Sequence, residues 1–129
     1  MLKRMASILI VDDDADAREP LARFLRKAGH QVDCVPNGRD ALASVLTETP
    51  DLVILDLFMP ELDGPLFLEV VRSYLRLQSL PVIVLTALPD SPMVDRARHL
   101  KVNCILVKTK ASLEDIQRCV EEVLPRLPQ

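Results

Sequence analysis

The chain has 129 residues and a formal net charge of −3, and 49% of its residues are hydrophobic. That length and composition suit one domain with a single buried core. No run of basic residues stands out, which argues against nucleic-acid binding through a basic face. No apolar run approaches the ~18 residues needed to span a bilayer. We therefore expect one cytoplasmic domain covering residues 1–129, with an ordered core over about residues 6–124 and no output domain.

The three cysteines, Cys34, Cys104 and Cys119, are odd in number and far apart, and no two form a Cys-x-x-Cys pair. This pattern predicts neither a disulfide framework nor a zinc site. We expect them to be reduced, small apolar core residues.

Five segments have the composition of β-strands. The strongest, residues 8–11, 52–55 and 82–85, are rich in β-branched residues and do not alternate between apolar and polar. Strands buried on both faces of a parallel sheet have this pattern. Residues 31–35 and 104–107 are weaker candidates.

Apolar residues recur at helical spacing in the five segments that follow these strands. In chain order, the stripes are Leu21, Phe24, Leu25 and Ala28; Ala41, Leu42, Val45 and Leu46; Leu66, Val70, Val71 and Leu75; Ala97 and Leu100; and Leu113, Ile116, Val120 and Val123. Gly29 is placed to end the first helix, and Ser91 and Ser112 to cap the fourth and fifth. Pro125 should end the fifth. Pro20 falls near the start of the first helix, where it costs one early hydrogen bond or delays the start.

Strand and helix therefore alternate five times. This order predicts an α/β fold with a parallel sheet, right-handed crossovers and helices on both faces. Five strands suit the doubly wound order 2-1-3-4-5, a flavodoxin-like (βα)5 three-layer sandwich.

Ligands of such folds bind beyond the carboxyl ends of the strands. The residues that follow the first, third, fourth and fifth strands are Asp12, Asp13 and Asp14; Asp56; Thr86 and Ala87; and Lys108. These four strands are neighbours in the expected order, so the polar groups should converge at one edge of the sheet.

Each residue type has a chemical use at that edge. Carboxylates suit Mg²⁺, which binds one or two of them together with waters and phosphate. A carboxylate can also be the nucleophile that forms an acyl phosphate. A cation, the Lys108 ammonium and the Thr86 hydroxyl could then stabilise the three outer phosphoryl oxygens, and the small Ala87 leaves room for them. Asp14 is better explained as a helix cap.

The segments 8–14 (ILIVDDD), 51–64 (DLVILDLFMPELDG) and 81–87 (PVIVLTA), with the isolated Lys108, resemble the response-regulator receiver domain of two-component signalling. The resemblance covers essentially the whole chain, and the segment around Asp56 is its most specific part. It implies phosphoryl transfer from a sensor histidine kinase or a histidine phosphotransfer protein. The resemblance further implies that the receiver itself would catalyse this transfer and its own slow dephosphorylation.

The resemblance also assigns the site residues. They are Asp56 as phosphoacceptor; Asp12, Asp13, Asp56 and the backbone carbonyl of Phe58 around Mg²⁺, or Mn²⁺ in its place; and Thr86, Ala87 and Lys108 around the phosphoryl group.

The chain departs from the family pattern on its usual readout face, formed by the fourth helix, fifth strand and fifth helix. Thr109 replaces a proline whose peptide bond is often cis; a cis bond before threonine costs about 3 kcal/mol, so we expect a trans bond and an altered loop. Ile105 replaces an aromatic ring that swings inward on activation. Lys101 and Val102 replace a Gly-Ala pair. The same face is where a homodimer would form.

The leading hypothesis is a phosphorylation-controlled module that changes its affinity for a downstream protein, which the sequence does not identify. The alternatives are a phosphorylation-independent scaffold and a phosphoryl-relay receiver cut from a larger hybrid protein. A phosphohydrolase would need a general acid two residues after Asp56, where Phe58 stands, so we expect a signalling receiver and not an enzyme. Apolar side chains at Phe58 and Leu88 should flank the path of hydrolytic water and prolong the life of the phosphoryl group.

Overall fold

The computed structural model describes residues 5–124, which form five strands and five α-helices in strict alternation. The strands are β1 (Ser7–Val11), β2 (Gln31–Val35), β3 (Leu52–Leu55), β4 (Val82–Thr86) and β5 (Cys104–Val107). The helices are α1 (Ala15–Lys27), α2 (Gly38–Thr47), α3 (Gly64–Ser73), α4 (Pro92–Arg98) and α5 (Leu113–Val123), with a short 3₁₀ helix, η1 (Leu75–Leu77), after α3. No helix within these residues is long and apolar enough to cross a membrane.

All strand pairs are parallel, and the strand order is β2-β1-β3-β4-β5, as predicted. The register places Val11 beside Leu55 and Thr86 beside Val107. Asp12 and Asp56 follow the first pair, and Lys108 follows Val107 of the second. All three residues therefore lie at the same edge of the sheet.

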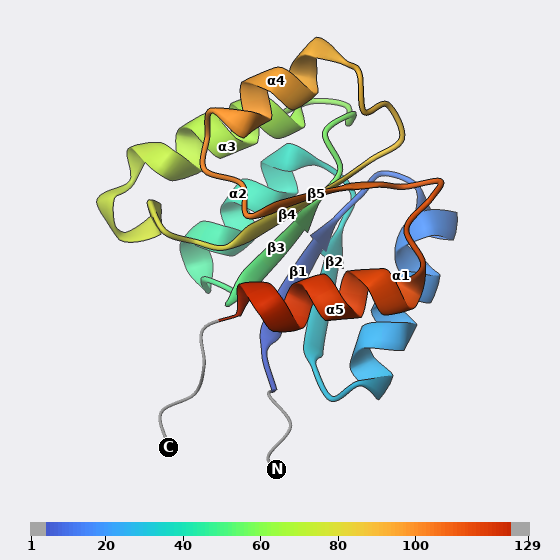
Figure 1. Ribbon diagram of the computed structural model, residues 1–129. Helices are drawn as coiled ribbons and strands as arrows, with labels where there is room; N and C mark the ends of the chain where they lie inside the picture. Colours follow the sequence, from blue (N-terminus) through green and yellow to red (C-terminus); the bar gives the residue numbers. More distant parts are fainter. Residues whose placement is uncertain (1–4, 125–129) are drawn as a thin grey trace.

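Helices cover both faces of the sheet and make a three-layer sandwich (Figure 1). Helices α1 and α5 pack on one face, over alternate apolar residues that include Ile10 and Ile54. Helices α2, α3 and α4 pack on the other, over residues that include Leu9 and Val53. The central strand β3 is buried along its whole length. Its lack of apolar–polar alternation is explained by this two-sided burial.

Most helix ends follow the predicted signals. The side chains of Asp14, Ser91 and Ser112 accept hydrogen bonds from backbone N–H groups in the first turns of α1, α4 and α5. Gly29 follows the end of α1 with φ +104°, in the left-handed region that glycine tolerates best.

Pro20 lies well inside α1, because the Asp14 cap starts the helix at Ala15. Of the two outcomes expected for Pro20, the loss of one hydrogen bond is therefore the one that occurs, without a delayed start. Pro125, expected to end α5, lies outside the described residues.

The predicted apolar stripe of α3 was correct at Val71, which is buried, but wrong at its two ends. Leu66 is 40% exposed, and Leu75 lies in η1 and is 84% exposed. Beside Val71, the buried face carries Phe67 and Leu68, which the predicted stripe left out. Both patterns have helical spacing, and only the contact of α3 with the sheet and with α2 and α4 selects between them. Leu100 likewise falls after the end of α4.

The expectation of three separate, reduced cysteines was wrong for two of them. Cys104 in β5 and Cys119 in α5 lie together as a disulfide pair, 15 residues apart in sequence. Cys34 is free. The pair was missed because its spacing matches no motif; the packing of α5 against β5 brings the two sulfur atoms together.

Candidate functional site

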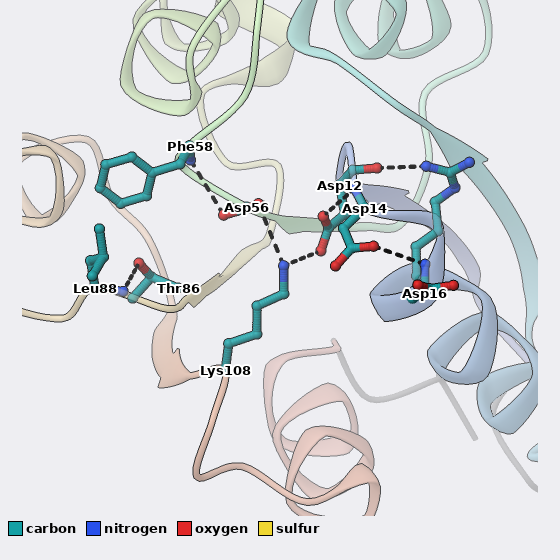
Figure 2. Close-up of polar contacts among 9 residues, drawn as sticks. Asp12, Asp14, Asp16, Asp56, Phe58, Thr86, Leu88 and Lys108 are labelled. Carbon is teal, nitrogen blue, oxygen red and sulfur yellow. Dashed lines mark hydrogen bonds and ion pairs between the residues drawn. The ribbon is translucent and has the colours of Figure 1, made fainter.

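Asp12, Asp56 and Lys108 meet at the carboxyl edge of the sheet, as their positions after β1, β3 and β5 predicted. The Lys108 ammonium nitrogen lies 2.6 Å from Oδ2 of Asp12 and 3.5 Å from Oδ2 of Asp56. Figure 2 shows the lysine side chain reaching between the two carboxylates. The backbone of Lys108 is held in place by its N–H, which donates to the Thr86 carbonyl at 2.7 Å.

Burial shapes the acidity of Asp56, which is only 7% exposed. The pKa of its carboxyl group is raised from 3.8 to about 6, chiefly because burial removes water from the carboxylate, with a smaller contribution from the neighbouring charge of Asp12. The Lys108 ammonium and the Phe58 N–H, which donates to Oδ1 at 3.3 Å, oppose this shift. A buried carboxylate with incomplete charge compensation is therefore poised to gain from a bound cation.

For Lys108, the neighbouring charges outweigh burial in setting the pKa, whereas for Asp56 burial outweighs the charges. Burial lowers the pKa of its ammonium group, but the hydrogen bond to Asp12 and the charges of Asp56 and Asp12 outweigh burial and raise it. Lys108 therefore stays charged beside the acidic groups, where it can receive an anion.

Three carboxylates form a group with the composition of a hard-cation site. Oxygen atoms of Asp12, Asp13 and Asp56 all lie within 4.8 Å of one another. Asp12 and Asp56 are buried, whereas Asp13 is exposed and leaves one side open to solvent. When ionised, the three carboxylates and Lys108 leave an excess of two negative charges. All-oxygen donors and this charge fit a divalent cation such as Mg²⁺, which keeps several waters.

Thr86 is completely buried at the end of β4. Its hydroxyl oxygen accepts a hydrogen bond from the Leu88 N–H at 3.1 Å, which orders the turn after the strand. Ala87 and Leu88 are exposed and Phe58 is half-buried. Figure 2 shows Phe58, Thr86 and Leu88 on one side of Asp56, opposite Asp12.

The loop after Asp56 is shaped by Gly64, the first residue of α3. Its N–H donates to the Leu57 carbonyl at 3.0 Å. A Cβ atom at position 64 would lie 2.6 Å from the Cα of Leu57, so a larger residue would push the loop away. Asp63 caps α3 by accepting a hydrogen bond from the Leu66 N–H at 2.8 Å.

The divergent positions are not among the residues that meet in this cluster. Ile105 packs against the core on the α2–α3–α4 face, and Thr109 is exposed. The described residues contain no cis peptide bond, so the trans bond expected before Thr109 is confirmed. Lys101 adopts φ +61°, a left-handed conformation that favours glycine.

Sequence reasoning missed Arg18. Its guanidinium donates to the backbone carbonyl of Asp12 at 2.9 Å, which anchors the acidic loop to α1. The sequence did offer a signal for this contact. Arg18 lies four residues after the Asp14 cap, and one helical turn brings a side chain at that spacing back toward the loop before the helix.

Comparison with known proteins decides the family. The family model for the response regulator receiver domain matches residues 8–121. The chain belongs to this family. It is thus a signalling module of two-component systems and not a classical enzyme.

Among curated relatives, the receiver is 43% identical to the response regulator Rre1 of Synechocystis over 122 residues, or 93% of this chain and 52% of the relative. It is also 43% identical to the transcriptional regulatory protein GltR of Pseudomonas aeruginosa, over 65% of this chain and 35% of the relative. The chain thus spans about a third to a half of the length of these relatives.

Solved receivers share the fold closely. The receiver domain of a signal transduction histidine kinase from Syntrophus aciditrophicus is 32% identical, with a TM-score of 0.84 over 92% of this chain and 89% of its own. The chemotaxis protein CheY4 of Vibrio cholerae is 30% identical, with a TM-score of 0.84 over 94% of this chain and 100% of its own.

Proposed function

We propose that this receiver accepts a phosphoryl group on Asp56 from a phosphohistidine donor, with Mg²⁺ bound, and thereby changes its affinity for a partner protein. The observation that supports this most directly is the position of the Lys108 ammonium, between the buried carboxylates of Asp12 and Asp56. An anion added to Asp56 would meet a cation that is already in place.

The reaction is a displacement at phosphorus. A carboxylate oxygen of Asp56 forms a bond to phosphorus while the bond from phosphorus to the donor's imidazole nitrogen breaks, and the released imidazole takes up a proton. Lys108 stabilises the negative charge on the outer phosphoryl oxygens. Thr86, whose hydroxyl now accepts from Leu88, would exchange that bond for one to a phosphoryl oxygen.

The residues of the acidic group would hold the cation. Asp12, Asp13 and Asp56 would supply carboxylate oxygens, and Phe58 its backbone carbonyl. When bound, the cation neutralises charge on the carboxylates and the transferring group. Mn²⁺ has similar oxygen preferences and would substitute.

The donor we propose is a sensor histidine kinase or a histidine phosphotransfer protein, because receivers of this family generally partner histidine kinases. Rearrangement of Thr86 and of the β4–α4 turn would shift the receiver between two conformations, and a partner with unequal affinity for them would sense the change. The α4–β5–α5 face is the proposed readout and homodimer surface, although Ile105 cannot supply the usual aromatic movement.

A relay role is the second candidate, because a receiver from a histidine kinase shares this fold and 32% identity. It differs from the first in one measurable way: the phosphoryl group would pass from Asp56 to a histidine of a phosphotransfer protein instead of being retained.

The test is incubation of the protein with Mg²⁺ and acetyl phosphate, followed by intact mass measurement. We expect one phosphoryl adduct, which is lost in Asp56→Ala and absent when a chelator replaces Mg²⁺. Asp33→Asn, which removes an exposed carboxylate from β2, is the matched control and should retain the adduct.

The outcomes separate the hypotheses. No adduct in the wild type under any condition would support the phosphorylation-independent scaffold. An adduct that survives Asp56→Ala would place the acceptor elsewhere. Transfer of the adduct to an added phosphotransfer protein would favour the relay.

A further inference from the structure

The Cys104–Cys119 pair lies outside the site described above and joins two elements of the readout face. Cys104 belongs to the edge strand β5, and Cys119 to α5, which packs beside it (Figure 1). The third cysteine, Cys34, lies on β2 at the opposite edge of the sheet. Because β2 and β5 lie at opposite edges, Cys34 cannot form a disulfide with either of the other two cysteines within one molecule. Cys104 and Cys119 can therefore pair only with each other.

The backbone spacing of the pair accommodates two states. The Cα atoms of Cys104 and Cys119 are 7.2 Å apart. Disulfides usually join Cα atoms about 4.4–6.8 Å apart, so this pair lies just beyond the wide end of the usual spacing. Two thiols also fit at this separation, so the bond can open without a large movement of α5 relative to β5.

A pocket of about 320 Å³ opens beside the pair. Its lining includes both cysteines and the side chains of Asp115, Arg118 and Glu122. Cys119 is only 6% exposed, whereas Cys104 is half-buried, so Cys104 is the sulfur that a reagent reaches first. Charges of both signs around the opening suit a small zwitterionic molecule.

We propose that Cys104 and Cys119 form a reversible redox site that reacts with small disulfides such as oxidised glutathione. The Cys104 thiolate attacks one sulfur of the small disulfide, forms a mixed disulfide and releases one thiol. The Cys119 thiolate then attacks the Cys104 sulfur and releases the second thiol. Two electrons pass from the protein to the reagent, and the two released thiols carry away the two protons.

Bond formation restrains the segment that joins β5 to α5. The covalent ring runs from position 104 to position 119 and so includes Lys108. The connection is otherwise held by backbone hydrogen bonds, among them those from Lys108 to Thr86 and from Ala111 to Val107. In the bonded form, α5 moves less relative to β5, and the loop carrying Lys108 opens less often. This inference concerns thiol chemistry and motion, and it holds whether or not Asp56 is phosphorylated.

The first test measures the bond in the full chain with Cys34→Ser, which removes the remaining thiol. The protein is equilibrated in buffers of graded oxidised-to-reduced glutathione ratio, treated with an alkylating reagent and weighed intact. We expect the two-thiol form to convert, as the ratio rises, to a form lighter by two hydrogen atoms that resists alkylation, and to return on reduction. Cys119→Ser should stop at a single glutathione adduct on Cys104, whereas Cys104→Ser, which keeps only the buried Cys119, should form its adduct more slowly. Two free thiols at every ratio, or a lasting adduct in the parent protein, would overturn the proposal.

The second test compares hydrogen exchange in the bonded and reduced forms of the same protein. Amides in β5, α5 and the loop between them should exchange at least several-fold more slowly in the bonded form, whereas those of α2 on the opposite face should not change. Equal exchange rates in the two forms would show that the bond does not restrain the segment, and would overturn that part of the inference.

Discussion

At the scale of single residues, Asp56 is a destabilising charge in the metal-free protein. Its pKa is about 6 in the folded state, above the ordinary 3.8, because burial disfavours its carboxylate. Between about pH 4 and 6, the folded protein binds more protons than the unfolded chain, so the free energy of unfolding falls as pH rises through this window. Above about pH 6 this contribution stays constant.

Asp56→Asn should therefore stabilise the protein at neutral pH. A shift from 3.8 to about 6 corresponds to up to about 3 kcal/mol at pH 7.5, and the difference from wild type should disappear near pH 4, where both side chains are neutral. Urea unfolding with a chelator present, repeated across this pH range, measures the effect.

The exposed neighbour Asp13 is the control for this experiment, because Asp13→Asn removes a similar charge without burial. We expect it to change the unfolding free energy by less than about 0.5 kcal/mol. An Asp56→Asn variant that is less stable than wild type at pH 7.5 would mean that the Lys108 ion pair outweighs desolvation.

Phe58 and Leu88 bear on how long a phosphoryl group on Asp56 would survive. They lie on the side of Asp56 opposite Asp12 (Figure 2), and neither offers a polar atom to position hydrolytic water. Replacing both, as Phe58→Asn with Leu88→Glu, should hasten decay of the phosphorylated form about tenfold, equivalent to about 1.4 kcal/mol in the barrier. The decay is followed by intact mass after acetyl phosphate is removed.

Leu75→Glu serves as the control, since Leu75 is 84% exposed in η1 and distant in sequence from both positions. Its phosphorylated form should decay at the wild-type rate. Slower decay in the double variant than in wild type would show that the apolar side chains do not protect the phosphoryl group.

At the scale of elements, Arg72 of α3 ties α4 and β5 to the rest of the molecule. Its guanidinium donates to the carbonyls of Leu77, Leu100 and Lys101 at 2.9 to 3.1 Å. These bonds hold the turn in which Lys101 takes its left-handed conformation.

Arg72→Met keeps a long apolar side chain but leaves the three carbonyls without their donor. Because the site is partly exposed, water compensates in part, and we expect a loss of about 2 kcal/mol in the free energy of unfolding. Urea unfolding gives the value. Hydrogen exchange should show the loss concentrated around the end of α4.

Arg96→Met provides a comparison within the same pair of helices. Arg96 pairs with Glu69 of α3 at 3.5 Å, and both side chains are about half exposed. Such a surface ion pair contributes less than about 1 kcal/mol. Equal losses in the two variants would mean that the carbonyl contacts of Arg72 add nothing beyond a surface charge.

Elements with strong local signals were predictable from the sequence. The composition of strands such as β3, apolar at every position, predicts burial on both faces of the sheet. Asp12, Asp56 and Lys108 could be placed because each directly follows a strand. The parallel order then implied that they meet. This logic needs only neighbouring residues and one rule of topology.

Contacts between distant side chains were not predictable in the same way. Arg72 meets Leu100, 28 residues away, and Cys104 meets Cys119 across a strand and a helix. The face of α3 was mistaken because Leu66 and Val70 have the same spacing as the buried Phe67 and Val71. In each case, the rotation and depth of a helix determine which side chains come into contact. These two properties depend on how the helix packs against other elements, which the local sequence does not specify.

At the scale of the whole molecule, the fold gathers excess negative charge at one edge of a sheet that is apolar on both faces. Asp12, Asp13 and Asp56 come from two central strands and cannot separate without breaking the register of β1 with β3. A cation that binds them must therefore stabilise the entire domain and not only a loop.

We thus expect Mg²⁺ to raise the melting temperature of the protein. A ligand that binds only the folded state adds RT ln(1 + [L]/Kd), which is about 1.4 kcal/mol for about 10 mM Mg²⁺ and a Kd of roughly 1 mM. For a domain of this size that corresponds to about 5 °C. The shift should shrink at pH 5, where Asp56, with a pKa of about 6, is mostly protonated.

Asp13→Asn separates metal binding from folding, because Asp13 is exposed and its loss leaves the core unchanged. Melting followed by calorimetry should give the wild-type temperature in chelator and little or no increase in Mg²⁺. Asp33→Asn, with an exposed charge removed from β2, should keep the full increase. Asp13 is one of the three grouped carboxylates, so its loss should weaken Mg²⁺ binding at this site. If Mg²⁺ raised the melting temperatures of Asp13→Asn and wild type equally, the cation would be binding elsewhere on this acidic protein.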